Sequence, residues 1–142
     1  MRNEREFNSC IGRSLDWHFK IPDDSRCEKP FDGFGIVNGK SIYWEAKFIH
    51  QPEAFNFHRL EDHQLRNLRE IKSLNPDAIC IVIIGVVFGR GDIRAFIFDD
   101  LDEIARRKEF NVSIKKKEWL QISDYLKVSS GYLNFCGIPQ FQ

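Results

Sequence analysis

The sequence has no excess of charge of either sign, because 21 lysine and arginine residues balance 21 aspartate and glutamate residues among 142. A balanced charge confers no general affinity for polyanions, so any nucleic-acid site must be a local patch. The sequence also lacks an apolar run of the roughly 18 to 20 residues that cross a bilayer, and its polar start lacks the apolar segment of a secretory signal. These absences predict a cytoplasmic protein with no membrane partner.

Cysteine motifs and glycine-rich loops are missing as well. Cys10, Cys27, Cys80 and Cys136 form no Cys-x-x-Cys pair and have no histidine at zinc-finger spacing. A structural metal or a disulfide is therefore disfavoured, and reduced thiols are expected. The glycines form neither a phosphate-binding loop nor a dinucleotide fingerprint, which argues against a nucleotide cofactor.

The sequence does contain enough apolar material for a core. Apolar residues make up 42% and aromatic residues 13% of the chain, with no repeat and no low-complexity segment. We therefore expect one domain over 1–142. Periodicity, turn residues and caps predict a helix over 6–20, a loop over 23–30, strands over 31–37 and 40–48, a helix over 59–74, strands over 78–88 and 93–98, and a helix over 101–108, with the tail from 109 unassigned. The order α-β-β-α-β-β-α predicts an α/β fold with a mixed sheet flanked by helices.

Asn38-Gly39 is the strongest short hairpin signal in the sequence, and it sets the pairing of the strands on either side. Counted outward from a two-residue bend, Asp32 lies directly opposite Glu45. Directly opposed side chains have Cβ atoms about 4.5–5.5 Å apart, and two carboxylates held there repel each other. Because side chains alternate along a strand, Lys47 shares the face of Glu45 while Ala46 points to the other face.

Two carboxylates and a lysine on one patch suit a divalent cation. Mg²⁺ is commonly bound by one or two carboxylates together with water and substrate phosphate. Asp32 and Glu45 would bind the ion, which would polarise a phosphodiester, and Lys47 would orient water or stabilise developing charge. The alternative is a hairpin rim in which Lys47 simply neutralises two surface acids. Gly33 and Gly35 could also introduce a bulge that changes the register.

Gln64 falls on the apolar face of the predicted helix over 59–74, and a buried amide needs hydrogen-bond partners. The edge of an active site would provide them, although a core glutamine bonded to the backbone fits equally well. His63, His58 and His50 are further candidates for metal or phosphate contacts, and each is more often an ordinary surface residue.

Basic residues gather in two places. Arg59, Arg66 and Arg69 belong to the predicted helix over 59–74, where Asp62 indicates an ion-paired solvent face. The second cluster has one acidic residue, Glu109, among its six cations, which makes it the better candidate for the DNA backbone. Its members are Arg106, Arg107, Lys108, Lys115, Lys116 and Lys117.

Together these residues resemble the PD-(D/E)xK nuclease superfamily and, within it, the RecU-type Holliday junction resolvases, including short phage members. The resemblance covers most of the chain. The Asp-x12-Glu-x-Lys core alone is a loose pattern, and the downstream segments make the match more specific. The segments that carry it are Phe31-Asp32-Gly33, Ile42-Tyr43-Trp44-Glu45-Ala46-Lys47, Phe55-Asn56-Phe57-His58 and Asp62-His63-Gln64-Leu65.

The resemblance implies a restriction-endonuclease-like core and a role for each matched position. Asp32 and Glu45 would bind the metal, with the backbone carbonyl of Ala46 as a further ligand. Lys47 would be the catalytic lysine, and Gln64 a supporting polar residue. The resemblance also implies Mg²⁺ or Mn²⁺ as cofactor, a homodimer, four-way DNA junctions as substrate, and a bacterial or phage protein acting in the cytoplasm.

The sequence departs from the family at two points. Asn8 follows Phe7 where the family usually has a glutamate, which leaves Glu6 or Glu4 as a candidate substitute ligand. The connection over 22–31 is shorter than the stalk of the cellular enzymes, which implies altered junction selectivity. A related nuclease acting on flaps or duplex ends, a catalytically impaired DNA-binding module and an interaction domain remain alternatives.

Overall fold

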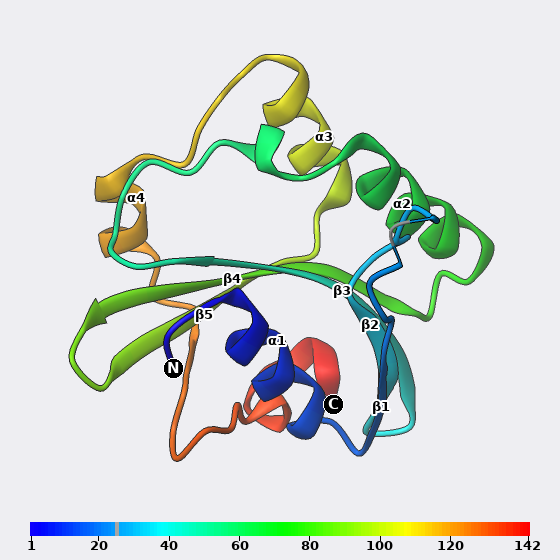
Figure 1. Ribbon diagram of the computed structural model, residues 1–142, viewed down its shortest axis with the longest axis horizontal. Helices are drawn as coiled ribbons and strands as arrows, with labels where there is room; N and C mark the ends of the chain where they lie inside the picture. Colours follow the sequence, from blue (N-terminus) through cyan, green and yellow to red (C-terminus); the bar gives the residue numbers. More distant parts are fainter. Residues whose placement is uncertain (25) are drawn as a thin grey trace.

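Six strands lie side by side in the part of the chain described by the structure, a computed structural model covering residues 1–24 and 26–142 (Figure 1). Their order across the sheet follows their order in the sequence. The strands are β1 (Trp17–Lys20), β2 (Gly33–Val37), β3 (Lys40–Ile49), β4 (Ile79–Gly89), β5 (Asp92–Phe98) and β6 (Leu126–Lys127). The helices are α1 (Glu4–Arg13), α2 (Asp62–Leu74), α3 (Leu101–Glu109) and α4 (Lys116–Gln121), with short 3₁₀ turns at Phe57–Arg59, Phe135–Gly137 and Pro139–Phe141.

The sheet is mixed, as predicted. β3 and β4 run parallel, joined by a connection that contains α2, and the other neighbouring strands run antiparallel. β4 is buried on both faces along most of its length, which explains its nearly continuous apolar sequence.

Helices cover both faces of the sheet (Figure 1). α1 lies on one face together with the carboxyl-terminal segment, drawn in blue and red, and their side chains form one apolar cluster with the sheet. α2, α3 and α4 lie on the opposite face over a second cluster. Along β3, Trp44 and Ala46 belong to the first cluster, whereas Tyr43 packs against the second. Glu45 and Lys47 alternate with Ala46 and therefore share the α2 face of the sheet.

The predicted first helix over 6–20 is wrong in its second half. α1 ends before Ser14, whose hydroxyl donates to the Cys10 carbonyl at 2.6 Å. The following residues form the edge strand β1, paired with β2. Trp17 and Phe19 alternate with polar residues and have side chains that favour strands. The helical spacing of residues from Phe7 to His18 concealed this strand.

The hairpin has the predicted register, with Gly33 opposite Trp44. Asn38 and Gly39 have φ angles of 54° and 77°, the left-handed values that a tight hairpin bend requires. β2 begins later than predicted, and just before it the register departs from the prediction. The Asp32 N–H donates to the Trp44 carbonyl at 3.0 Å, although Trp44 is the partner of Gly33, so Asp32 is not directly opposite Glu45. This irregularity is the kind of bulge that Gly33 could introduce, whereas the pairs from Gly33 to Val37 show no shift.

The remaining elements lie close to their predicted positions, and the unassigned tail contributes α4 and β6. Trp119 of α4 is fully buried, with its ring centroid 4.9 Å from that of Phe96. The predicted loop over 23–30 includes residue 25, which lies outside the described residues. Among the described helices, none is both long and apolar enough to cross a membrane.

Candidate active site

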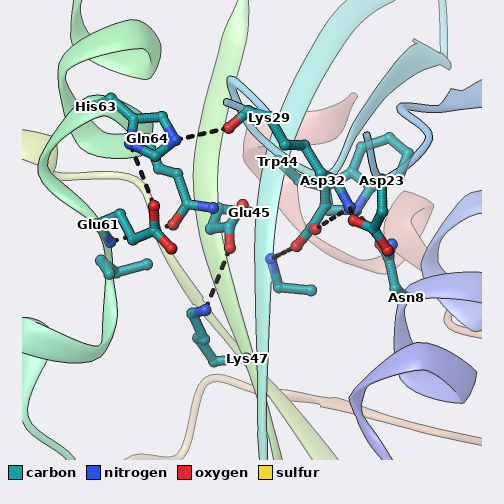
Figure 2. A network of polar contacts seen from close by, with 12 residues as sticks. Asn8, Asp23, Lys29, Asp32, Trp44, Glu45, Lys47, Glu61, His63 and Gln64 are labelled. Carbon is teal, nitrogen blue, oxygen red and sulfur yellow. Dashed lines mark hydrogen bonds and ion pairs between the residues drawn. The ribbon is translucent and has the colours of Figure 1, made fainter. Parts of the chain in front are cut away.

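Asp32 is fixed in place by the main chain of the neighbouring strand. Its Oδ2 accepts a hydrogen bond from the Ala46 N–H at 2.7 Å. Its Oδ1 lies 2.9 Å from the Lys29 ammonium group, in the segment before β2 (Figure 2). Peptide and ammonium donors together hold this carboxylate in a defined orientation next to β3.

Glu45 is the one acidic side chain among the buried polar residues of the described chain, with only 2% of its surface exposed. Its Oε2 lies 3.4 Å from the Lys47 ammonium group, whereas Oε1 is buried and has no hydrogen-bond partner. Burial, reinforced by the negative charge of Asp32, raises the pKa of Glu45 to about 8, although Lys47 acts in the opposite direction. A buried acceptor without a donor is costly, which indicates a site that is complete only when something binds there.

Lys29 is a site residue that the sequence analysis missed. Besides Asp32, its ammonium group contacts Asp23 at 3.2 Å. Burial alone would lower the pKa of Lys29, but the hydrogen bonds and charges of Asp32 and Asp23 outweigh it and raise the pKa. Lys29 precedes Asp32 by three positions in a segment read only as a loop, so opposite charge at short spacing was the available signal.

α2 contributes two of the predicted residues. Gln64 is 8% exposed, and its Oε1 accepts from the Glu61 N–H at 3.2 Å, while Figure 2 shows its amide extending toward Glu45. The Nε2 of His63 lies 2.8 Å from the Lys29 carbonyl oxygen, which can only accept, so Nε2 is the donor. His63 therefore positions the segment that carries Lys29.

These side chains line one cleft of about 800 Å³ between α1, α2 and the sheet. Neither His50 nor His58 lies in it. The described residues that line the cleft are Glu4, Arg5, Asn8, Lys20, Ile21, Pro22, Asp23, Cys27, Glu28, Lys29, Asp32, Glu45, Lys47, Glu61, His63 and Gln64.

α1 brings Asn8 to this cleft but not Glu6. The Asn8 Oδ1 accepts from the Trp44 indole N–H at 2.7 Å, which anchors α1 to the sheet. Glu6 instead accepts from the Arg2 backbone N–H at 2.7 Å and lines a different hollow. Of the two candidate substitutes for the missing glutamate, only Glu4 lines the cleft.

The second basic cluster lies outside the cleft and is partly neutralised. Arg106 pairs with Glu103 at 2.6 Å, and Arg107 contacts the same carboxylate at 3.2 Å. Lys108 pairs with Asp62 at 2.5 Å. The three lysines at 115–117 are exposed and have no ion pair within the described residues, so they are the free cations of this cluster.

The donor set fits a hard divalent cation. Asp32 and Glu45 offer carboxylate oxygens, and the unpartnered Oε1 of Glu45 lacks only a positive partner. The described residues contain no cluster of three or more His, Cys, Asp or Glu side chains that would form a closed cage. Two carboxylates with room for water and phosphate are typical of Mg²⁺ sites. The structure places the N–H of Ala46 beside Asp32. That the backbone carbonyl of Ala46 binds the metal remains an expectation from the family resemblance.

Two carboxylates and a lysine converge in one cleft beside β3 of a mixed sheet, and this arrangement identifies the protein as a member of the PD-(D/E)xK nuclease superfamily. The family model for Recombination protein U, RecU, matches residues 26–137, so the chain belongs to the RecU family. This match confirms the resemblance seen in the sequence.

Known proteins that are similar to the chain include two Holliday junction resolvases. The Holliday junction resolvase RecU of Bacillus subtilis (strain 168) is 35% identical over 102 residues, which cover 69% of this chain and 45% of that protein. The chain thus matches less than half the length of this curated relative. The solved structure of Archaeoglobus fulgidus Hjc, a Holliday junction resolvase, matches with a TM-score of 0.43 and 10% identity, covering 84% of this chain and 97% of that one.

Proposed function

We propose that the protein is a metal-dependent endonuclease that hydrolyses phosphodiester bonds in branched DNA, as a Holliday junction resolvase does. The observation that carries this proposal is the buried carboxylate of Glu45, which has one oxygen without a partner and lies beside Asp32 and Lys47. A structural role would not require two acids to be held together against their mutual repulsion. A bound cation would compensate both acids.

Mg²⁺ or Mn²⁺ would be held by Asp32 and Glu45. When bound, such an ion polarises the phosphodiester and lowers the pKa of a water ligand, which supplies the nucleophile. The chain's own residues then do the positioning. The Ala46 N–H orients Asp32, and Lys47 places a positive charge 3.4 Å from the Glu45 carboxylate, where it would also stabilise charge on the phosphate.

Lys29 would stabilise the site when no metal is bound. It neutralises Asp32 there at 2.9 Å, so that the two acids do not face each other uncompensated. With a cation bound to Asp32, Lys29 would be able to contact a phosphate oxygen of the substrate. Its flexible side chain and compact charge suit such an exchange of partners.

We propose four-way junctions as the substrate because the similar B. subtilis protein is named a Holliday junction resolvase. A four-way junction has two-fold symmetry and needs two symmetric cuts, so we also propose a homodimer with one site in each copy. A second function, binding of DNA without cutting, is favoured by one observation. Asn8 stands where the family usually has a glutamate, and its amide oxygen is already bonded to Trp44.

The test is cleavage of synthetic four-way junctions, with linear duplexes and flaps of matched sequence as controls. With Mg²⁺ or Mn²⁺ the wild-type protein should cut junctions faster than linear duplexes or flaps, and a chelator should stop the reaction. Asp32→Asn should bind junctions without cutting them. Cutting that persists in chelator would overturn the proposal, and metal-independent binding with no cutting in either ion would favour the second function.

A further inference from the structure

An aromatic surface continues from the active site along the same face of the sheet. Beyond β1 and β2 the antiparallel pairing includes Ile21, whose N–H donates to the Asp32 carbonyl at 2.9 Å. Ile21 and Phe31 lie on this face with Glu45 and pack with the apolar cluster under α2, and Asp32 lines the cleft next to Phe31. The next row on this face is Phe19, Phe34 and Tyr43. Rows two residues apart along a strand are separated by about 7 Å.

The rings in this second row touch one another. The centroid of Phe34 lies 5.6 Å from that of Phe19 and 6.1 Å from that of Tyr43. Trp17 follows in the third row, 5.9 Å from Phe34. We call Trp17, Phe19, Phe34 and Tyr43 the aromatic row. It spans β1, β2 and β3 and reaches the cleft through Ile21.

The outer half of the aromatic row is open to solvent. Trp17 is 52% and Phe19 48% exposed, although both carry large apolar rings. Other large exposed apolar side chains, such as Phe110 and Leu120, lie on or beside the helices or in the tail and not on β1 or β2. Contiguous exposed apolar surface of this kind marks an interaction site.

The position and composition of the surface point to nucleic-acid bases. Where it adjoins the catalytic carboxylates it is made of rings, and an aliphatic side chain, Ile36, joins it only at the far end. Every base has a flat face that stacks on aromatic side chains, so such surfaces hold unpaired nucleotides without sequence preference. Lys20, directly after Phe19, points to the α1 face, where its ammonium group donates to the Ser9 hydroxyl at 2.8 Å, and it lines the cleft as a cation for the accompanying phosphate.

We propose that the aromatic row stacks an unpaired base next to the phosphodiester bond that is cut. This inference rests on the proposed function, because it assumes a DNA strand in the cleft. Stacking here would place the neighbouring phosphate over Glu45, one row away on β3, and over Asp32, which lines the same cleft. It would also favour branch points, where base stacking is interrupted, over continuous duplex.

The tryptophans provide a direct readout. Trp44 and Trp119 are fully buried, whereas Trp17 is exposed, so DNA in contact with the protein surface can reach only the Trp17 ring directly. Adding a four-way junction in chelator, where no cutting occurs, should quench the emission of the wild-type protein. Trp17→Phe keeps a ring, so it should abolish the quenching while junction affinity stays within about twofold.

Affinity measurements separate stacking from simple apolar contact. Phe19→Ala should weaken junction binding about tenfold, Phe19→Tyr should restore it, and Phe19→Leu, which keeps apolar area without a ring, should not. Phe110→Ala, at an exposed ring just after α3, is the matched control and should bind as the wild type.

Each result decides between the two proposals. Wild-type junction cutting with unchanged tryptophan emission and full affinity in Phe19→Ala would overturn the stacking proposal alone. Quenching and weakened Phe19→Ala binding without cutting in any metal would leave stacking in place and overturn the proposed function. A smaller mass by light scattering for Phe19→Ala, with unchanged DNA affinity, would mean that the aromatic row joins two copies of the chain, and stacking would be wrong.

Discussion

β3 and β4 lie side by side and parallel, yet they carry very different side chains. β4 is apolar from Ile79 to Phe88 and almost wholly buried. β3 is also largely buried, but it carries Glu45 and Lys47 on the α2 face, opposite Val82 and Ile84 of β4.

The difference separates stability from chemistry within one sheet. β4 is enclosed by strands and helices on all sides, and its burial stabilises the fold. β3 borders the part of the sheet where the helical cover ends and the cleft opens, so a charged pair can lie next to the core and still reach a ligand. If this division is correct, substitutions in the two strands should affect different measurements.

The largest effect is expected at Lys47. Lys47→Ala removes the cation beside Glu45 and should lower the rate of junction cutting about a thousandfold, the order found for loss of one group that stabilises transition-state charge. Single-turnover cutting assays measure this change. Lys40→Ala, on the same strand outside the cleft, is the control and should cut at the wild-type rate. Equal losses for both lysines would show that the strand, not the site, was disturbed.

A core substitution in β4 should have the opposite profile. Ile83 is fully buried on the α1 face, so Ile83→Ala should lower the free energy of unfolding by about 2 to 5 kcal/mol. Denaturant unfolding gives this value. At low temperature, where the variant stays folded, its cutting rate should lie within about threefold of the wild type. A loss of activity as deep as that of Lys47→Ala would break the division between the strands.

The stability of the metal-free protein should depend on pH through Glu45. Because its pKa is about 8 in the folded protein against an ordinary value of 4.5, the native state holds this proton more tightly than the unfolded chain does. The stabilisation is fully present below 4.5 and is lost as the pH rises through 8. Melting temperatures of the metal-free protein should therefore fall over this range, and Glu45→Gln should reduce this fall.

Mn²⁺ should restore stability at the alkaline end of the range, since it binds the ionised carboxylate of Glu45. A decline that persists unchanged in Glu45→Gln would assign the effect to another group.

The smallest effect is expected on the far side of the molecule. The exposed lysines at 116 and 117 lie on α4, over the half of the sheet that contains β4 and β5. If DNA reaches them, Lys116→Ala combined with Lys117→Ala should reduce the slope of log affinity against log salt by about one per lysine. Arg106→Ala should change it less, because Glu103 already pairs with Arg106. An unchanged slope in the lysine variant would confine DNA contacts to the β1–β3 half.

Local signals made part of the site predictable from the sequence. Asn38-Gly39 determines a bend of known length, and alternation then places Glu45 and Lys47 on one face of β3. Asp32 reaches the same cleft, but one position out of the register that counting from the bend predicts. The apolar face of α2 likewise indicated that Gln64 points inward. These predictions needed only neighbours along one or two strands.

The missed features depend on contacts between distant segments. β1 looked like a continuation of the first helix because its pairing with β2 overrides a helical spacing of apolar residues. Lys29 could not be assigned because its neighbours Asp23 and His63 come together only in the folded chain. The basic cluster was incompletely described for the same reason, since Asp62 of α2 neutralises Lys108 of α3.

The length of the bend at Asn38-Gly39 sets the register of β2 against β3 and so affects an active centre some distance away. β3 is locked by its long parallel partner, so one residue inserted into the bend would make β2 slip instead, and every β2 side chain would change faces. Asp32 would then lose its hydrogen bond with the Ala46 N–H while Glu45 stayed where it was. A sheet of normal appearance would be left with half a catalytic centre, which makes loop length as much a determinant of this chemistry as the acids themselves.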